Sequence, residues 1–191
     1  GAHVPQAPRA KGGRVVAIGR FVGIKGFDTL IRAFAQVEGA YLWLAGEGEK
    51  RPTLEALAHD LGVIDRVRFL GWVEEPMHLV ASADAYVMPS RHEPLGNVIL
   101  EAWRSATPVV ATRSEGPSWF CEDGTDALLV DIDDVDAMAH ALLRLRAEPD
   151  LAAQLVTAGQ AQLSEKFTKS RVVAQYLALI DGDLSAMDFG R

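Results

Sequence analysis

The sequence predicts an α/β fold in which helices cover both faces of a parallel sheet. Two observations lead to this expectation: short apolar segments alternate with longer amphipathic ones, and the short segments carry apolar residues on both faces. Strands that are buried on both faces are typical of parallel sheets. The chain has 191 residues, of which 49% are hydrophobic, so it is long enough for one well-packed domain with short appendages.

Each expected strand ends where a glycine, a proline or a polar turn stops the apolar run. The strands are expected at residues 14–18, 40–45, 67–70, 84–89, 108–112 and 127–130. About six parallel strands with helices between them form a Rossmann-like layer. In such a layer, ligands bind beyond the carboxyl ends of the strands, so the loops that follow the strands are the candidate sites.

The intervening helices are expected where apolar residues recur about every 3.6 positions, as Leu54, Leu57 and Leu61 do. Helices are expected at residues 27–36, 52–61, 76–82, 98–104, 135–147, 151–167 and 170–179, and a turn-rich loop at 113–126. We divide the chain into a linker or cloning remnant (1–12), a ligand-binding domain (13–167), a closing helix (168–181) and a tail (182–191).

The most informative segment is residues 93–101, which read Glu-Pro-Leu-Gly-Asn-Val-Ile-Leu-Glu between an expected strand and an expected helix. Free backbone N–H groups and the positive end of a helix dipole attract anions at such a point. Gly96 lets a phosphate approach the backbone closely. The Glu101 carboxylate can accept two hydroxyl protons, which suits the vicinal diol of a ribose. Glu93 then faces whatever lies beyond the phosphates, so the pattern favours a nucleotide sugar as ligand.

The loop after the first strand supplies basic groups for the same site. Two glutamates eight positions apart also occur by chance in many helices, but this loop adds Arg20 and Lys25 at the same edge of the sheet. A diphosphate carries about two negative charges that two carboxylates would repel, so basic groups must offset them. Arg20 can bind phosphate as a fork and Lys25 as a point charge. The alternative is two solvated cations on an ordinary loop, and the shared edge with Glu93 and Glu101 disfavours it.

Composition argues against several other function classes. The net charge is −7 and no run is rich in Lys or Arg, so nucleic acid is not an expected partner. The one cysteine, Cys121, excludes an intrachain disulfide and suits a reducing compartment. We find neither a signal peptide nor an apolar run of membrane-spanning length, and we expect a cytoplasmic protein. The acidic run at residues 131–136 is expected to cap the next helix rather than to bind a metal.

Five short motifs follow one another between residues 13 and 179. They are Gly-Arg at 19–20 with Lys-Gly at 25–26, Ala-Gly-Glu-Gly at 45–48, Val-Arg-Phe-Leu-Gly at 67–71, the E-x7-E motif at 93–101, and Ala-Thr-Pro-Val-Val-Ala-Thr at 106–112. Each motif is weakly specific by itself. Together and in this order they resemble the C-terminal, donor-binding domain of GT-B glycosyltransferases of the retaining, glycogen-synthase-like kind (family 4).

The resemblance implies a catalytic role for Arg20, Lys25 and Glu93, of which the first two bind the diphosphate and Glu93 the transferred hexose. It also implies that Glu101 binds the ribose and that the loop after the third strand meets the base through its backbone. The implied donor-nucleotide contacts are Gly19, Gly46, Gly71, Trp72, Val73, Leu95, Gly96, Asn97, Val98 and Glu101. A UDP-sugar is the preferred donor and a GDP-sugar the alternative, and neither a metal nor another cofactor is expected.

GT-B enzymes of this kind hold the acceptor on a separate N-terminal domain, which we expect to be a partner missing from this chain. We therefore expect half of a hexosyltransferase, inactive alone, with any peripheral membrane association through the other half. The sequence departs from the family pattern at two places. Leu95 stands where Phe is usual, which changes the shape of an apolar pocket. Residues 114–118 replace the common Gly-Gly turn, and this departure concerns the contacts of that loop with the donor sugar.

Two other function classes stay open. One is a nucleotide-binding or regulatory module that keeps the pocket without catalysis. The other is a Rossmann dehydrogenase domain, which is disfavoured because no Gly-x-Gly-x-x-Gly follows the first strand.

Overall fold

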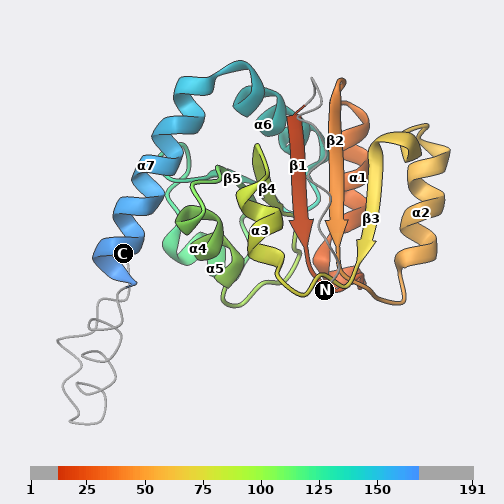
Figure 1. Ribbon diagram of the computed structural model, residues 1–191, viewed down its shortest axis with the longest axis horizontal. Coiled ribbons are helices and arrows are strands. Elements are labelled where there is room, and N and C mark those ends of the chain that lie inside the picture. Colours follow the sequence, from red (N-terminus) through yellow and green to blue (C-terminus); the bar gives the residue numbers. More distant parts are fainter. Residues whose placement is uncertain (1–12, 168–191) are drawn as a thin grey trace, which may run out of the picture.

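The computed structural model describes residues 13–167, in which a six-stranded sheet lies between two layers of helices (Figure 1). The strands are β1 (Gly13–Ile18), β2 (Ala40–Ala45), β3 (Val67–Gly71), β4 (Ala85–Met88), β5 (Val109–Thr112) and β6 (Leu128–Val130). The helices are α1 (Phe27–Ala35), α2 (Arg51–Asp60), α3 (Pro76–Ala81), α4 (Asn97–Arg104), α5 (Glu115–Phe120), α6 (Val135–Ala147) and α7 (Pro149–Lys166). Two short 3-10 helices cover Gly23–Lys25 and Ile64–Arg66.

The strand order is β3-β2-β1-β4-β5-β6, and all neighbouring strands are parallel. The chain builds the sheet outward from β1 to β3 and then returns to the other side of β1 with β4. The order therefore reverses between β1 and β4, and their following loops diverge to leave a crevice at the carboxyl ends. The expected Rossmann-like parallel sheet with helices on both faces is confirmed.

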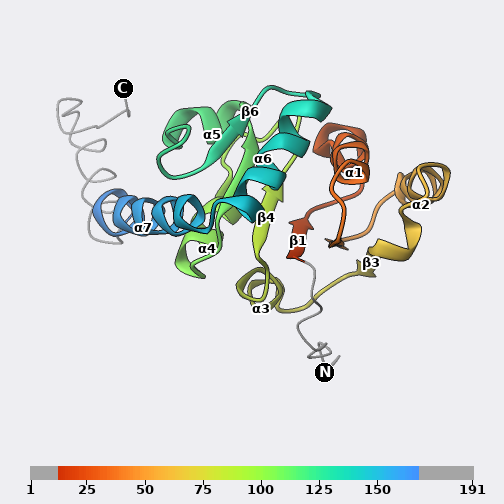
Figure 2. The same cartoon turned by 90° about the horizontal axis from the view of Figure 1, so that it is seen from above.

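The strands are buried on both faces because successive side chains point to opposite sides of the sheet. In β1, Val15 and Ala17 pack into a core with residues of α1, α2 and α6. Val16, between them, packs into a second core with residues of α3 and α4. Seen from above, the two helical layers lie on opposite sides of the strands (Figure 2).

One expectation about local structure is wrong. The loop expected at residues 113–126 contains helix α5, although Gly116 and Pro117 are poor helix formers. Tertiary contacts stabilise this short helix, because the Phe120 ring packs edge-on against Trp103 with 5.7 Å between the ring centroids. The closing helix expected at 170–179 lies outside the described residues, as do the linker and the tail.

The acidic run before α6 caps that helix, as expected. The side chain of Asp134 accepts a hydrogen bond of 2.8 Å from the backbone N–H of Ala137. Across residues 13–167, no three His, Cys, Asp or Glu side chains are grouped so that they could hold a metal ion. Within the same residues, no helix is both long and apolar enough to cross a membrane.

Candidate functional site

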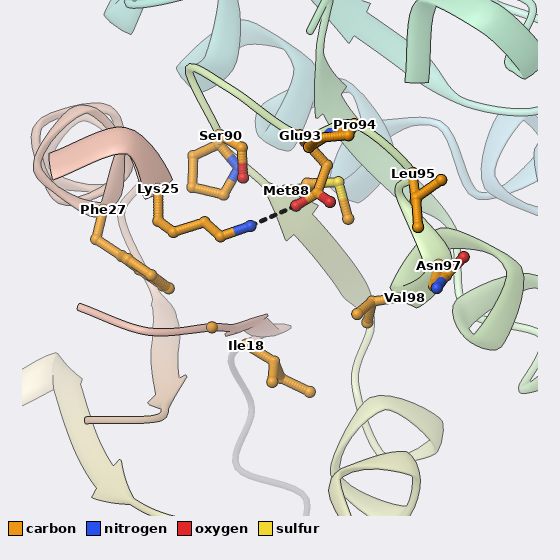
Figure 3. A pocket seen from close by; sticks show the side chains of 12 residues that line it. Ile18, Lys25, Phe27, Met88, Ser90, Glu93, Pro94, Leu95, Asn97 and Val98 are labelled. Carbon is orange, nitrogen blue, oxygen red and sulfur yellow. Dashed lines mark hydrogen bonds and ion pairs between the residues drawn. The ribbon is translucent and has the colours of Figure 1, made fainter. Parts of the chain in front are cut away.

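A cavity of about 320 Å³ opens at the point where the strand order reverses (Figure 3). This volume lies within the range of about 300–1,000 Å³ that is usual for small-molecule sites. The cavity is lined by residues of β1, β4, their following loops and the starts of α1 and α4: Ile18, Gly19, Lys25, Phe27, Met88, Pro89, Ser90, Glu93, Pro94, Leu95, Asn97 and Val98. Six of the predicted site residues therefore share one cavity: Gly19, Lys25, Glu93, Leu95, Asn97 and Val98.

The charged pair of this cavity is Lys25 and Glu93. Lys25 ends the 3-10 turn after β1, and its Nζ donates a hydrogen bond of 2.5 Å to Glu93 Oε2 across the cavity (Figure 3). The two side chains are 23% and 16% exposed, so a ligand in the cavity can still reach them. A partly buried cation next to a carboxylate can bind an anionic group on one side and a hydroxyl on the other.

The second oxygen of Glu93 points to the start of α4. Glu93 Oε1 accepts a hydrogen bond of 3.3 Å from the backbone N–H of Gly96, the residue that precedes the first turn of the helix. The positive end of the α4 dipole therefore faces the cavity and favours negative charge there. The first turn of α4 itself holds no acidic residue, and the Glu93 carboxylate supplies one negative charge at this end of the helix.

Glu101 lies on α4 and is half-buried. It follows Asn97 by four positions and Val98 by three, so it shares a helix face with these two cavity-lining residues. Glu101 itself does not line the cavity. Burial raises the pKa of Tyr86 on β4, and the negative charges of Glu93 and Glu101 raise it further. Both carboxylates therefore lie near enough to Tyr86 to affect its ionisation.

Arg20 lies on the same loop as Lys25, but its side chain is exposed and does not line the cavity. The next residue, Phe21, is fully buried, with its ring against Phe27 and Phe69. The loop therefore sends Phe21 into the core and Arg20 to the solvent. The assignment of Arg20 to the diphosphate stays a prediction.

The predicted glycines meet at the carboxyl ends of β1, β2 and β3. Gly46 donates a hydrogen bond of 2.8 Å to the carbonyl of Gly71, and a Cβ on Gly46 would lie 1.9 Å from the carbonyl oxygen of Gly19. Only glycine at position 46 allows the two loops to approach this closely. Trp72 and Val73 follow this cluster, and Trp72 is 83% exposed. None of these residues except Gly19 lines the cavity, so their contacts with a nucleotide stay predictions.

Arg91 joins the loop that carries Lys25 to the loop that carries Glu93, a role for which the sequence held no signal. Its backbone N–H donates a hydrogen bond of 2.8 Å to the carbonyl of Ile24. Its guanidinium donates one of 2.5 Å to the carbonyl of Gly23. Both acceptors belong to the turn that ends at Lys25, so Arg91 fixes the separation of the two loops.

Two carboxylates hold the Arg91 guanidinium in place. Arg91 donates two hydrogen bonds to Asp28, of 2.9 and 2.8 Å, and forms an ion pair of 2.7 Å with Asp133. Partial burial by itself would raise the pKa of the Asp28 carboxyl, but the hydrogen bonds and the positive charge of Arg91 outweigh it, so the pKa is lowered. Hydrogen bonds from Arg91 and from Thr29 lower the pKa of Asp133 as well.

Comparison with known proteins gives this geometry a family context. Residues 12–148 match the family model described as glycosyl transferases group 1. The chain belongs to this family. The resemblance to GT-B glycosyltransferases is thus confirmed at the level of family and fold.

Two curated relatives illustrate the range of the family. The chain is 49% identical over 87% of its length to the lipopolysaccharide core biosynthesis glycosyltransferase LpsE of Rhizobium meliloti (strain 1021), of which it covers 49%. It is 36% identical over 90% of its length to a GDP-mannose-dependent alpha-(1-6)-phosphatidylinositol monomannoside mannosyltransferase of Mycobacterium tuberculosis, of which it covers 48%. The chain spans about half the length of the curated relatives it matches.

Solved structures of glycosyltransferases share the fold. The crystal structure of Anabaena HepE in complex with UDP-glucose matches 91% of this chain and 50% of its own, with a TM-score of 0.84 and 27% identity. The sucrose-phosphate synthase of Thermosynechococcus elongatus matches 93% of this chain and 47% of its own, with a TM-score of 0.82 and 30% identity.

Proposed function

We propose that this chain is the donor-binding half of a retaining, family 4 glycosyltransferase that transfers a hexose from a nucleotide diphosphate sugar. The observation that carries the proposal is the Lys25–Glu93 pair in the cavity between β1 and β4. Membership of the group 1 glycosyltransferases supports the reaction type. The reversal of strand order at this cavity supports binding of a nucleotide there.

The diphosphate is assigned to Lys25 and the start of α4. An ammonium group has three N–H donors, of which one engages Glu93, so two can reach phosphate oxygens. The α4 dipole attracts the same negative charge. Arg20, exposed on the same loop, supplies a second cation from the rim. With these groups in place, the diphosphate needs no divalent metal.

The two carboxylates are assigned to the two sugars. Glu101 shares a helix face with Asn97 and Val98 and accepts hydrogen bonds from the two ribose hydroxyl groups. Glu93 lines the cavity opposite Lys25 and accepts hydrogen bonds from hydroxyl groups of the transferred hexose.

In the transfer step, the bond between the anomeric carbon and the diphosphate oxygen breaks, and the acceptor oxygen forms its bond on the same face of the sugar. The leaving diphosphate gains negative charge and takes the proton of the acceptor. Lys25 and Arg20 stabilise that charge electrostatically, which lowers the barrier for departure.

The nucleotide base and the acceptor are proposed only as classes of molecule. UDP is the preferred nucleotide, and the crystal structures of HepE with UDP and with UDP-glucose support it. A GDP-sugar is the alternative, which the GDP-mannose-dependent mycobacterial relative supports. The acceptor is assigned to an N-terminal domain of the full enzyme, and this chain alone is assigned binding without transfer.

Titration calorimetry with UDP, GDP, ADP and NAD, in buffer that contains EDTA, tests the proposal. We expect binding of UDP or GDP without metal and no measurable binding of NAD. Preferential binding of NAD would favour a dehydrogenase domain. Binding of nucleoside diphosphates that EDTA abolishes and magnesium or manganese restores would contradict the metal-free assignment of the diphosphate.

A further inference from the structure

The start of α5 binds both polar groups of the Glu93 main chain, the N–H and the carbonyl. Glu115 Oε2 accepts a hydrogen bond of 3.0 Å from the backbone N–H of Glu93. The backbone N–H of Gly116 donates one of 2.7 Å to the carbonyl of Glu93. Both polar groups of the Glu93 main chain are thus bound by the first two residues of α5.

The contact leaves no room for another side chain at position 116. A Cβ on Gly116 would lie 2.8 Å from the Glu93 carbonyl oxygen and 2.7 Å from the carbonyl carbon of Leu95. These neighbours are backbone atoms, which cannot swing aside as the end of a side chain can. The α5 backbone is therefore pressed directly against the loop that carries Glu93.

Glu115 is held as an anion. Hydrogen bonds from its own backbone N–H, from that of Glu93 and from His92 lower the pKa of its carboxyl to about 2. Glu115 Oε1 lies 2.6 Å from Nδ1 of His92, the residue just before Glu93. One carboxylate thus fixes two consecutive residues of the Glu93 loop, so the orientation of this stretch depends on it.

We propose that Glu115 is a positioning residue that aims the Glu93 carboxylate at the transferred sugar. The proposal rests on the sugar-binding role proposed for Glu93. Glu115 holds the backbone N–H of Glu93, and the orientation of this main chain sets the direction in which the Glu93 side chain leaves the loop toward Lys25. Loss of this contact leaves the nucleotide contacts of Lys25 and Glu101 in place but misdirects Glu93. It therefore weakens recognition of the sugar more than recognition of the nucleotide.

The test compares the wild type with Glu115→Ala and Glu115→Gln. Glu38→Ala is the matched control, because its exposed side chain lies just before β2, at the amino ends of the strands and away from the cavity. Hydrogen exchange of the Glu93 amide, measured by NMR, reports the contact itself. Calorimetry with UDP and UDP-glucose, and with GDP and GDP-mannose, reports the affinity ratio of nucleotide sugar to nucleotide for the pair that the wild type binds.

In Glu115→Ala we expect the Glu93 amide to exchange about 3–10-fold faster and the affinity ratio to fall by a similar factor. Glu115→Gln keeps an oxygen acceptor and should restore both quantities to within about twofold of the wild type. Glu38→Ala should change neither quantity. If Glu115→Ala does not fold, Glu115→Asp shortens the side chain by one methylene, and the same two shifts are expected from it.

Unchanged exchange at Glu93 would overturn the contact, and faster exchange with an unchanged affinity ratio would overturn the positioning role. In either case, a wild type that binds the nucleotide sugar leaves the proposed function intact. A wild type that binds none of the four ligands would instead overturn the proposed function, and with it the role of Glu115.

Discussion

Lys25 Nζ and Glu93 Oε2 lie 2.5 Å apart, although the residues are 68 positions apart in the chain. The contact brings the loop after β1 against the loop after β4, so a cation and a carboxylate share one cavity. Each charge partly balances the other, and a diphosphate that enters meets a cation that is already paired. Removal of Lys25 would therefore do more than delete one phosphate contact, because it would leave the Glu93 carboxylate to repel the ligand.

Lys25→Met should weaken UDP or GDP binding by about 1.5–3 kcal/mol, roughly 10- to 150-fold, the usual range for a hydrogen bond to a charged group. The corresponding nucleosides, which lack phosphate, should lose little affinity. Calorimetry with both ligands measures the difference. Lys166→Met, in the last turn of α7, is the control and should match the wild type. An equal loss for nucleoside and nucleotide would mean that Lys25 does not contact the phosphates.

Glu101→Ala should weaken ribonucleotides by about 1.5–3 kcal/mol and spare 2′,3′-dideoxy analogues, because only the ribose diol can donate to its carboxylate. Calorimetry with UDP and 2′,3′-dideoxy-UDP measures the two losses. Arg104→Ala changes an exposed residue of the same helix and serves as the control for helix stability. If the dideoxy ligand loses as much affinity as the ribonucleotide, Glu101 is not on the diol.

The sequence predicts those elements whose structure is decided by the local hydrophobic pattern. It does not predict an element that depends on tertiary contacts. The apolar run of β5 predicts a strand that is buried on both faces, and all four residues of Val109–Thr112 are buried. Helix α5 is missed because Gly116 and Pro117 disfavour a helix locally. It forms because the Gly116 N–H donates a hydrogen bond to the Glu93 carbonyl and the Phe120 ring packs on Trp103. Both contacts join residues that are far apart in the sequence, so the local sequence does not predict them.

The candidate site is predictable as a set of residues but not as a set of contacts. Strand topology alone brings Lys25 and Glu93 to one edge of the sheet, because both follow strands of the same parallel sheet. Whether Lys25 or Arg20 enters the cavity depends on how the intervening loop turns, and the burial of Phe21 decides it. Arg91 contacts Gly23, Asp28 and Asp133, which lie more than 40 positions away in the sequence. The repeating patterns of helices and strands do not reach over such separations, so the sequence did not predict these contacts.

Arg91→Met should destabilise the protein by about 1–2 kcal/mol at pH 7, because it removes the hydrogen bonds and ion pairs with Asp28 and Asp133. The loss is no larger because these side chains are partly exposed to solvent. The pKa values of Asp28 and Asp133 are lowered from 3.8 in the folded protein, so their stabilising contribution is present above pH 4 and is lost as pH falls through the lowered values. The difference between variant and wild type should therefore shrink toward pH 2. Urea unfolding across this range, with Arg32→Met as the exposed control, measures it. A difference that is constant with pH would contradict the ion-pair assignment.

Asp126→Asn should stabilise the protein above pH 6. Asp126 is buried, and burial together with the charge of Glu122 raises its pKa from 3.8 to about 6. The folded protein therefore holds this proton more tightly than the unfolded chain, so the wild type loses stability as pH rises from about 4 to 6. An asparagine has no charge to bury. In the wild type, Gln162 Nε2 donates a hydrogen bond of 2.5 Å to Asp126 Oδ2, and Gln162 Oε1 is buried without a hydrogen-bond partner among the described residues. If the Gln162 amide turns over, its Oε1 can accept from the asparagine amide.

We expect the stability gain of Asp126→Asn over the wild type to grow between pH 4 and pH 8 by up to about 3 kcal/mol. Urea unfolding at each pH measures it, and Asp65→Asn, at an exposed site, should show no such growth. A gain that is equal at both pH values would mean that Asp126 does not titrate in this range.

A crystal structure of the chain with UDP or GDP, grown with EDTA present, tests the donor-site assignment most directly. We expect the diphosphate within about 3.2 Å of Lys25 Nζ at the start of α4, the ribose hydroxyls on Glu101, and Glu93 facing the space beyond the β-phosphate. A nucleotide bound away from the crevice between β1 and β4, or one whose phosphates avoid Lys25, would contradict the assignment.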